Sequence, residues 1–353
     1  MRCTNNHKKF RKQENRHICR IRQIRRFFCM CCINTLLITT AGCGSSADIS
    51  LDTPYQVYQS AVSLGMADRT STALETHSYF GKNLCVLANG TNIGTDSVHS
   101  EVAEAAGTFN LATGEVVYAQ NIYEKLYPAS TTKILTAYIA LKYCDDLSQT
   151  VTVSEHAVDQ EEDSSVCNLA AGDVITVKDL LYGLMLPSGN DAAIALAEFI
   201  SGSDEEFAAL MNKEALALGA AQSHFVNPNG LPDDDHYTSV YDLYLIAQAA
   251  FSNETFQEIT HTATYNAVYT DAQGNTVERT WNNSNRYLTG DIETPEGFTI
   301  VGGKTGTTGE AGYCLVLYSK NAKDEPVISI VLKADCRINL YLLMSEMLSG
   351  FAN

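Results

Sequence analysis

A serine and a lysine three residues apart form the first candidate for chemistry in this sequence. They lie in the stretch Pro128–Lys133, where Ser130 and Lys133 fall on the same face of an expected helix. A serine hydroxyl becomes a strong nucleophile only when a base takes its proton, and a lysine is such a base only if desolvation or a nearby cation lowers its pKa. By itself the pair is a weak indication, because a helix-capping serine beside an exposed lysine has the same spacing.

A second polar motif, Ser188-Gly189-Asn190, stands between two apolar stretches. Ser188 can relay a proton, and the Asn190 amide can donate to a substrate carbonyl while it accepts from a lysine ammonium. The alternative is a plain turn in which Asn190 or Asp191 caps the next helix, and we expect Asp191 to be a cap.

The third motif lies at the end of a strand-like run, in Val301–Thr308. Lys304 and Thr305 can meet a carboxylate there, and the backbone N–H of Thr307 can join that of Ser130 as an oxyanion hole. Glycines permit the close approach of another backbone, and this stretch has three, Gly302, Gly303 and Gly306. A plain turn is the alternative, and the spacing of a phosphate-binding loop is absent.

Strand patterns at both ends of the chain and helical patterns in the middle must position these motifs. Helices are expected at Ser130–Tyr143, Val177–Met185 (capped by Thr176), Asp191–Ile200, Asp204–Leu218, Val240–Phe251 and Leu340–Leu348. Strands are expected at Ala103–Phe109, Glu115–Ala119, Tyr265–Thr270, Thr276–Thr280, Thr299–Gly302, Tyr313–Ser319 and Val327–Leu332. This order predicts an α+β fold with one sheet built from distant segments.

The N-terminal region is predicted to be a targeting segment. Residues 1–42 hold ten basic residues and one acid, and the apolar run Phe27–Ile38 is too short to span a membrane, so we expect a cleaved signal peptide over 1–42. An uncleaved anchor is the alternative. The small residues before Cys43 resemble a bacterial lipobox, which implies a lipid on Cys43. Residues 43–80 are predicted to be a tether with a short helix near Tyr55–Met66, and residues 81–353 one catalytic domain.

Charge and cysteine spacing exclude several classes of function. The chain has a net charge of −17, and removal of residues 1–42 leaves 14 basic and 40 acidic residues, so the body would repel a phosphate backbone and nucleic acid is not expected as a partner. No C-x-x-C spacing occurs beyond Cys43, so no zinc site or redox motif is predicted. We expect mostly buried free thiols, with Cys144–Cys167 and Cys314–Cys336 as conceivable pairs; the remaining cysteine is Cys85.

Taken together, S-x-x-K at Ser130, S-x-N at Ser188 and K-T-G at Lys304 resemble the signature of the penicillin-binding protein and serine β-lactamase superfamily. Within it the chain is similar to the low-molecular-mass D-alanyl-D-alanine carboxypeptidases, also in Leu180–Ala192 and Asn227–Leu231. The resemblance implies a β-lactamase/transpeptidase-like fold, an antiparallel sheet packed against a helical region, with no cofactor and no metal.

The resemblance also implies a role for each catalytic residue. Ser130 would be acylated by the penultimate D-alanine of a peptidoglycan stem peptide, with loss of the terminal D-alanine, and β-lactams would be covalent inhibitors. Lys133 would be the general base, with its pKa lowered by burial and by Lys304. Ser188 and Lys304 would return a proton to the leaving amine, and Asn190 would hold the peptide carbonyl.

Substrate binding is assigned, by the same resemblance, to the third motif and a late arginine. Lys304, Thr305, Gly306 and Thr307 would bind the substrate, with Lys304 charged against its carboxylate. Thr307 stands where these carboxypeptidases usually have histidine, which keeps the backbone donor and changes the wall. Family members use an arginine on a late strand near the carboxylate, and Arg337 is the nearest match.

Three other functions remain open at this point. A β-lactamase shares the acylation machinery, but class A enzymes carry Ser-Asp-Asn and a downstream glutamate, whereas Gly189 and Asn227–Gly230 offer neither, so slow release of β-lactams is expected. A D,D-endopeptidase has the same motifs, and so does a non-catalytic penicillin-recognising lipoprotein. The expected location is extracytoplasmic, with the protein held on the outer face of the bacterial cytoplasmic membrane by a lipid on Cys43.

Overall fold

The structure is a computed structural model that describes residues 84–87 and 91–351. By their contacts, these residues belong to the unit His77–Asn353. The predicted signal peptide 1–42, Cys43 and the tether 43–80 with its helix at Tyr55–Met66 lie outside the described residues, so the predicted limits of the catalytic domain stay a prediction.

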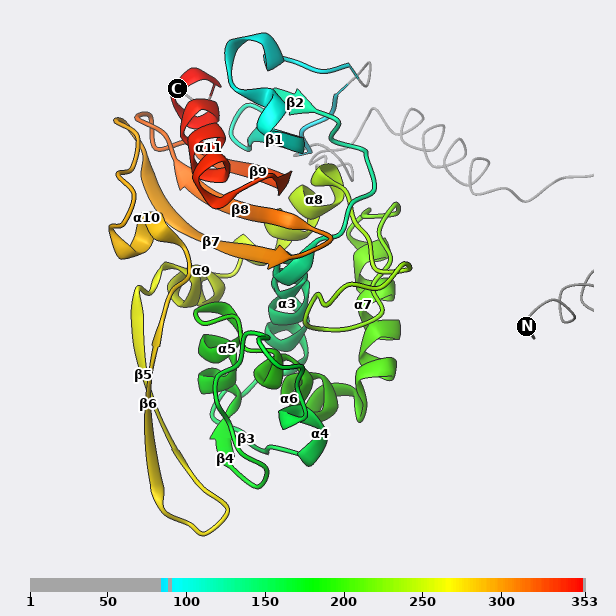
Figure 1. Cartoon of the computed structure of the whole chain (residues 1–353), viewed down its shortest axis with the longest axis vertical. Helices are drawn as coiled ribbons and strands as arrows, with labels where there is room; N and C mark the ends of the chain where they lie inside the picture. The colour runs from blue at the N-terminus through cyan, green and yellow to red at the C-terminus, as the bar shows by residue number, and fades with distance from the viewer. Residues whose placement is uncertain (1–83, 88–90, 352–353) are drawn as a thin grey trace, which may run out of the picture. The chain divides into compact units, whose positions relative to one another are not determined.

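Strands from both ends of the described chain form a five-stranded antiparallel sheet (Figure 1). Its order is β2-β1-β9-β8-β7, and β1 pairs with β9 from Ala103↔Ala334 to Asn110↔Val327. The strands are β1 (Ala103–Asn110), β2 (Glu115–Gln120), β7 (Thr299–Thr308), β8 (Gly312–Lys320) and β9 (Pro326–Ala334). The α+β fold with a sheet assembled from distant segments is therefore confirmed.

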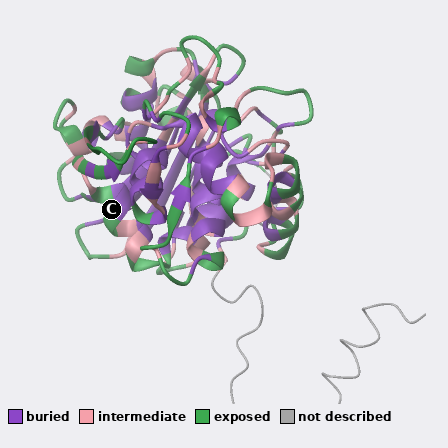
Figure 2. Ribbon diagram, turned by 90° about the horizontal axis from the view of Figure 1, so that it is seen from below, coloured by how far each residue is buried: buried purple, intermediate pink, exposed green. Residues whose placement is uncertain are grey.

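Both faces of this sheet are covered by helices, which explains why its inner strands read as continuous apolar runs. Leu315 and Leu317 of β8 pack with the C-terminal helix, whereas Val316 between them faces the larger core on the other side. Buried residues accordingly run through the interior in Figure 2, with exposed residues at the periphery. The longer helices are α3 (Lys133–Tyr143), α5 (Val177–Met185), α6 (Asn190–Ser201), α7 (Asp204–Ala217), α8 (Val240–Phe251), α9 (Glu254–His261) and α11 (Arg337–Phe351).

Helix α3 lies at the centre of the helical region, in contact with α5, α6, α7, α8 and α9. Its apolar residues Ile134, Leu135 and Ile139 are completely buried, as the sequence predicts for a helix enclosed on most sides. Four of the neighbouring helices, α5, α7, α8 and α9, begin with a side-chain cap. Thr176 Oγ1 accepts from the Asp179 N–H at the start of α5, which confirms that predicted cap.

The strands predicted at Tyr265–Thr270 and Thr276–Thr280 were expected to belong to the one main sheet. They form a hairpin in a second, four-stranded sheet, so that expectation was wrong. Its order is β3-β4-β5-β6. Side-chain contacts give the reason: the ring of Tyr265 on β5 stacks on Tyr182 of α5 at 3.6 Å, and its hydroxyl donates to Asp179 Oδ1 at 2.6 Å. These strands are β3 (Thr150–Thr152), β4 (Val174–Thr176), β5 (Thr264–Thr270) and β6 (Thr276–Asn282), and the short helices are α4 (Glu155–Val158), α10 (Arg286–Thr289) and the 3-10 turns η1 (Thr95–Ser97), η2 (Ser100–Val102) and η3 (Ala129–Thr132).

The five described cysteines are free thiols, as expected. Four of them are buried, namely Cys85, Cys144, Cys167 and Cys314, and Cys336 is half-buried. Neither conceivable pair is a disulfide in the structure.

Candidate active site

The nucleophile candidate Ser130 lies in the 3-10 turn η3, which leads directly into α3. The preceding residue, Ala129, has a left-handed backbone conformation with φ 48°. A residue with a Cβ seldom adopts that conformation, and strain of about 1–3 kcal/mol of this kind clusters at functional sites. The expected helix at Ser130 thus begins as a tight turn, and regular α-helix starts only at Lys133.

Lys133 connects the first predicted motif to the second and to the segment 226–231. Its Nζ lies 2.9 Å from Ser130 Oγ, 2.8 Å from Asn190 Oδ1 and 2.6 Å from the carbonyl oxygen of Asn229. The side chain is fully buried. Burial, and next the charge of Lys304, hold the pKa of Lys133 well below its ordinary value, although nearby Cys167 and Asp191 act in the opposite direction. The structure therefore favours a neutral amine beside the serine hydroxyl, which is what a general base requires.

Ser188 stands at the junction of α5 and α6 in a left-handed conformation, with φ 69°. Its Oγ is buried and has no hydrogen-bond partner among the described residues. A buried hydroxyl without a partner costs free energy, and such groups in native proteins call for an explanation. A substrate or water that accepts from Ser188 would provide one.

Asp191 does not cap α6, so that expectation was wrong. The N-cap is Gly189, and Asp191 lies inside the first turn. Its carboxylate accepts from the Ala192 N–H of that turn at 2.9 Å, and from the backbone N–H groups of Cys167 and Leu169 at 2.8 and 3.1 Å. The Asn190 N–H in turn donates to the Ser165 carbonyl at 2.8 Å. These bonds fix the segment 165–169 against the start of α6, beside Asn190.

Strand β7 carries the K-T-G motif along the edge of the main sheet, as predicted, but it continues to Thr308 instead of ending at Gly302. The longer strand follows from its pairing with β8, which includes Lys304↔Val316 and Thr307↔Tyr313. At Gly306 a Cβ would lie 2.9 Å from the Ser130 nitrogen, so only glycine lets the strand pass this close to the nucleophile.

Lys304 is as buried as Lys133, and its Nζ donates to the Thr305 carbonyl at 2.9 Å. Burial lowers its pKa to about 7. The expectation that Lys304 is charged thus holds only below about pH 7 in the unliganded protein. Thr305 Oγ1 lies 2.6 Å from Ser284 Oγ at the surface of the strand.

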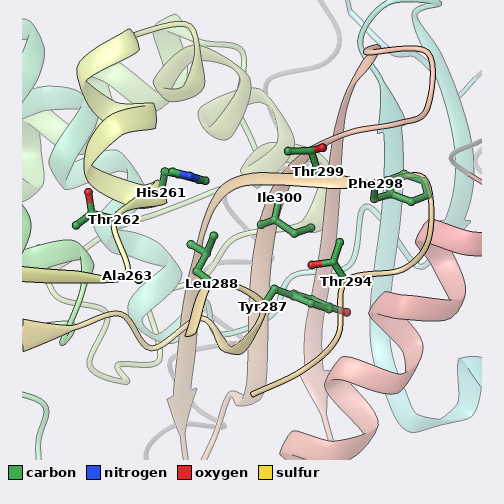
Figure 3. Close-up of a pocket in the computed structure, with 9 residues that line it drawn as sticks. All are labelled: His261, Thr262, Ala263, Tyr287, Leu288, Thr294, Phe298, Thr299 and Ile300. Carbon is green, nitrogen blue, oxygen red and sulfur yellow. The ribbon is translucent and has the colours of Figure 1, made fainter. Parts of the chain in front are cut away.

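Part of this group faces a cavity of about 330 Å³, which is lined by Ser130, Asn190, Asn229 and Thr307. Its outer wall is acidic, with Glu161, Glu162, Asp163 and Glu310. A wider hollow of about 520 Å³, drawn in Figure 3, lies by the other end of β7 and includes His261, Leu288, Phe298 and Ile300. None of the predicted catalytic residues lines that hollow, so the smaller cavity is the candidate active site.

A family model described as D-alanyl-D-alanine carboxypeptidase, peptidase family S11, matches residues 94–336. The chain belongs to this carboxypeptidase family. The match includes all three motifs and the segment 226–231, so the resemblance predicted from the motifs is confirmed.

Relatives and solved structures within the family agree with this assignment. The chain is 40% identical over 224 residues to the D-alanyl-D-alanine carboxypeptidase DacF of Bacillus subtilis, an alignment that covers 62% of this chain and 54% of the relative. It is 36% identical over 234 residues to the D-alanyl-D-alanine carboxypeptidase of Streptomyces sp. strain K15, with 63% and 78% covered. The chain thus spans about half the length of the first relative and most of the second.

Two solved structures show the same fold. The crystal structure of the Streptomyces K15 DD-transpeptidase superposes with a TM-score of 0.65 and 31% identity, over 70% of this chain and 96% of that one. The D-alanyl-D-alanine carboxypeptidase DacD from Francisella tularensis gives a TM-score of 0.62 with 29% identity, over 74% and 71% of the two chains.

Arg337 of this family member begins α11 and does not lie on a strand, so the expected location was wrong. Its guanidinium lies 5.8 Å from the centre of the Tyr313 ring. It nevertheless lines a second cavity, of about 280 Å³, together with Thr305 and Thr307. The structure therefore brings Arg337 next to the K-T-G motif.

Arg286 lines this second cavity too, and the sequence analysis missed it. Two of the three arginines in the described part of the chain thus face one cavity beside Thr305, and neither forms an ion pair with a described carboxylate. Their scarcity in an acidic body is the one signal by which Arg286 could have been found. Among the described residues, no cluster of three or more histidine, cysteine or acidic side chains is placed to hold a metal.

Proposed function

We propose that this protein is an exported serine D-alanyl-D-alanine carboxypeptidase that removes the terminal D-alanine of peptidoglycan stem peptides through an acyl-enzyme on Ser130. The observation that carries the proposal is the position of the buried Lys133 amine, within hydrogen-bond distance of both Ser130 Oγ and Asn190 Oδ1. A base so placed can take the serine proton, and positioned proton transfer contributes typically about 10²–10⁴-fold to a rate.

In the acylation step, Ser130 Oγ attacks the carbonyl carbon of the penultimate D-alanine while its proton moves to Lys133. The backbone N–H groups of Ser130 and Thr307 stabilise the oxyanion that forms. The peptide C–N bond then breaks, and the leaving amine receives a proton from the Lys133 ammonium through Ser188. The unpartnered Ser188 Oγ supports its role as the donor to the leaving amine, and in the complex it would accept from the Lys133 ammonium in turn.

In the deacylation step, a water molecule replaces the leaving amine. Lys133 takes a proton from the water, the resulting hydroxide attacks the ester carbonyl, and the proton returns to Ser130 Oγ as the C–O bond breaks. The products are the shortened peptide and free enzyme. The same mechanism makes β-lactams covalent inhibitors, since their ring carbonyl acylates Ser130 and the leaving amine stays attached to the acyl group.

The substrate carboxylate is assigned to the K-T-G side of the cavity. Lys304 and Thr305 contact it directly, and Gly306 and Thr307 continue the strand along the peptide. Arg286 and Arg337 add positive charge from the adjoining cavity, which supports a carboxylate on this side. These cations offset the acidic residues that line the active-site cavity, Glu161, Glu162, Asp163 and Glu310.

Export and anchoring complete the proposal. The basic leader, the short apolar run and the small residues before Cys43 favour cleavage and lipidation at Cys43, with the enzyme held on the outer face of the bacterial cytoplasmic membrane. In the part of the chain that the structure describes, no helix is long and apolar enough to cross a membrane.

The test is to incubate the purified protein with a pentapeptide ending in D-Ala-D-Ala, a cross-linked peptide dimer and penicillin. We expect free D-alanine and a penicillin adduct that mass spectrometry places on Ser130, and neither with Ser130→Ala. A penicillin adduct without release of D-alanine would indicate the non-catalytic penicillin-recognising lipoprotein. Rapid turnover of penicillin would indicate a β-lactamase, and cleavage of the cross-linked dimer alone would indicate an endopeptidase. D-alanine release by Ser130→Ala would refute the assignment of the nucleophile.

A further inference from the structure

The segment 226–231 forms one wall of the active site, although it lies far from α3 in the sequence. The carbonyl oxygen of Asn229 accepts from Lys133 Nζ at 2.6 Å, and the carbonyl oxygen of Pro228 accepts from Thr136 Oγ1 at 2.6 Å. Both donors stand on the same face of α3, three residues apart. The position of the Lys133 amine therefore depends on where this segment lies.

The same segment also touches the backbone of the nucleophile. Gly230 has φ 89°, and a Cβ at this position would collide with the carbonyl oxygen of Ala129 and lie 3.0 Å from the Ser130 nitrogen. A displacement of the segment would thus disturb the serine as well as the lysine.

One histidine connects the start of this segment to the residue before Lys133. Nε2 of His236 lies 2.9 Å from Thr132 Oγ1, and its Nδ1 accepts from the Val226 N–H at 3.1 Å. The imidazole is fully buried and packs against the Phe225 ring, with centroids 5.5 Å apart and planes at 83°.

These contacts fix the tautomer of His236. A backbone N–H can only donate, so Nδ1 carries no proton, and the neutral ring donates from Nε2 to Thr132 Oγ1. Burial lowers the pKa of His236 to about 4; the charge of Asp233 opposes this, and His224 and Lys133 add to it. Both hydrogen bonds therefore persist at neutral pH.

We propose that His236 is a positioning residue for acylation: its two hydrogen bonds fix the segment 226–231 against α3, so that the Asn229 carbonyl holds the Lys133 amine beside Ser130. This inference rests on the proposed function, because Lys133 has its role there. The His236 ring touches none of the reacting atoms and acts through Thr132 and the segment. Small misplacements of reacting groups can cost about 10²-fold in rate, so even a modest shift of the amine is measurable.

The test compares variants that break or keep the bond between His236 and Thr132. Thr132→Val removes it from the α3 side and His236→Asn from the other, since asparagine is too short to reach Thr132 but can still accept from Val226. Thr132→Ser keeps the hydroxyl. Thr108→Val is the matched control, because it removes a buried hydroxyl that lies 3.2 Å from Ser329 Oγ within the main sheet.

Penicillin acylation of the full chain is followed by stopped-flow, with thermal unfolding as the measure of the fold. We expect Thr132→Val and His236→Asn each to slow acylation at least tenfold, and the double variant to be no more than about threefold slower than the slower single one, because both remove the same bond. Thr132→Ser should stay within about threefold of the wild type. Thr108→Val should be destabilised like Thr132→Val and acylate at the wild-type rate.

The pH profile supplies a readout that loss of stability alone would not move. The acylation rate falls at low pH as Lys133 becomes protonated, and we call this part of the pH–rate profile the acid limb. Release of the segment 226–231 admits water to Lys133, which raises the pKa of the amine and therefore moves the acid limb to higher pH. The other groups that act on Lys133, namely Lys304, Asp191 and the buried Cys167 thiol, are unchanged in these variants, and His236 is already neutral above its pKa of about 4.

The outcomes separate this inference from the proposed function. A wild-type protein that penicillin does not acylate would overturn the proposed function and this inference with it. A wild type that acylates, together with a folded Thr132→Val or His236→Asn protein within threefold of it and with the same acid limb, would overturn the inference alone. A tenfold loss in Thr132→Ser would do the same, since that variant keeps the bond.

Discussion

The proposed function gives the two buried lysines opposite requirements, because Lys133 would have to be neutral to act as a base and Lys304 charged to bind a carboxylate. Lys133→Arg should therefore slow penicillin acylation at least about 10³-fold, since a guanidinium does not give up its proton in proteins. Lys304→Arg keeps the charge and should retain partial activity. The pKa of Lys304, lowered to about 7 by burial, also predicts that wild-type binding of an anionic penicillin weakens as pH rises through 7.

The measurement is the acylation rate and the dissociation constant from pH 5 to 9 in the three proteins. In Lys304→Arg the weakening above pH 7 should disappear, because arginine stays charged over the whole range. A Lys133→Arg enzyme within a few-fold of the wild type would contradict the role of Lys133 as the base.

At the level of single residues, the sequence predicts those contacts of the site that follow from the spacing of side chains along a helix. Ser130, Lys133 and Asn190 meet as expected, because each stands at the beginning of a helix whose face is set by its apolar pattern. The carbonyl of Asn229 has no side-chain signature, and the partner of His236 is decided by a fold that brings residues more than 100 positions apart together. Such contacts require the tertiary structure.

At the level of elements, the sequence predicts where helices begin, because capping residues mark those positions. It does not predict the second sheet. Thr176 caps α5 because its oxygen reaches the Asp179 N–H without any tertiary help. Strands β3 and β4 have only three residues each, too few for a period-2 pattern. The β5–β6 hairpin joins them where β5 pairs with β4 at Val174↔Thr270, and Tyr265 stacks on Tyr182 of α5. Tertiary packing therefore decides where that hairpin lies.

At Asp191, too, tertiary contacts prevail over the local capping role that the sequence predicts. Its bonds to the segment 165–169 lead to a testable prediction. Asp191→Asn replaces one carboxylate oxygen by a donor that faces the N–H groups of Cys167 and Leu169, and should lower the free energy of unfolding by about 1–3 kcal/mol. The loss of its negative charge also lowers the pKa of Lys133 further, so the acid limb of acylation should move to lower pH.

Urea unfolding and the pH profile of acylation check this expectation. Asp242→Asn is the matched control, because its buried carboxylate accepts from the Gln222 N–H at 2.8 Å and is not among the groups that act on Lys133. Asp242→Asn should lower the free energy of unfolding by a similar amount and leave the acid limb of the pH–rate profile unchanged. An Asp191→Asn enzyme with the acid limb of the wild type would exclude the electrostatic coupling.

At the level of the whole molecule, the charge is divided between a basic leader and an acidic body, which fits a segment that directs export and is then removed. Stable attachment to a membrane generally takes more than one acyl chain, and a diacylglycerol on Cys43 would supply two. Cys43→Ser should therefore move the protein to the medium or leave the uncleaved precursor. Cell fractionation with mass measurement checks this, and an unchanged distribution with an unchanged mass would exclude lipidation.

Global stability should also depend on pH through the buried His236. In the unfolded chain its pKa is near the ordinary 6.5, and in the folded protein burial lowers it to about 4. Between these values the unfolded state binds more protons, so the contribution of His236 to stability is fully present above pH 6.5 and is lost as pH drops toward 4. The difference between the two pKa values corresponds to about 3 kcal/mol, most of which is lost by pH 4.5.

Urea unfolding at pH 7.5, 5.5 and 4.5 measures this loss. His236→Asn, which cannot titrate, should lose about 2–3 kcal/mol less than the wild type over the same range, because the titration of one buried imidazole is removed from the pH dependence. Parallel curves for the two proteins would show that His236 is not the group responsible.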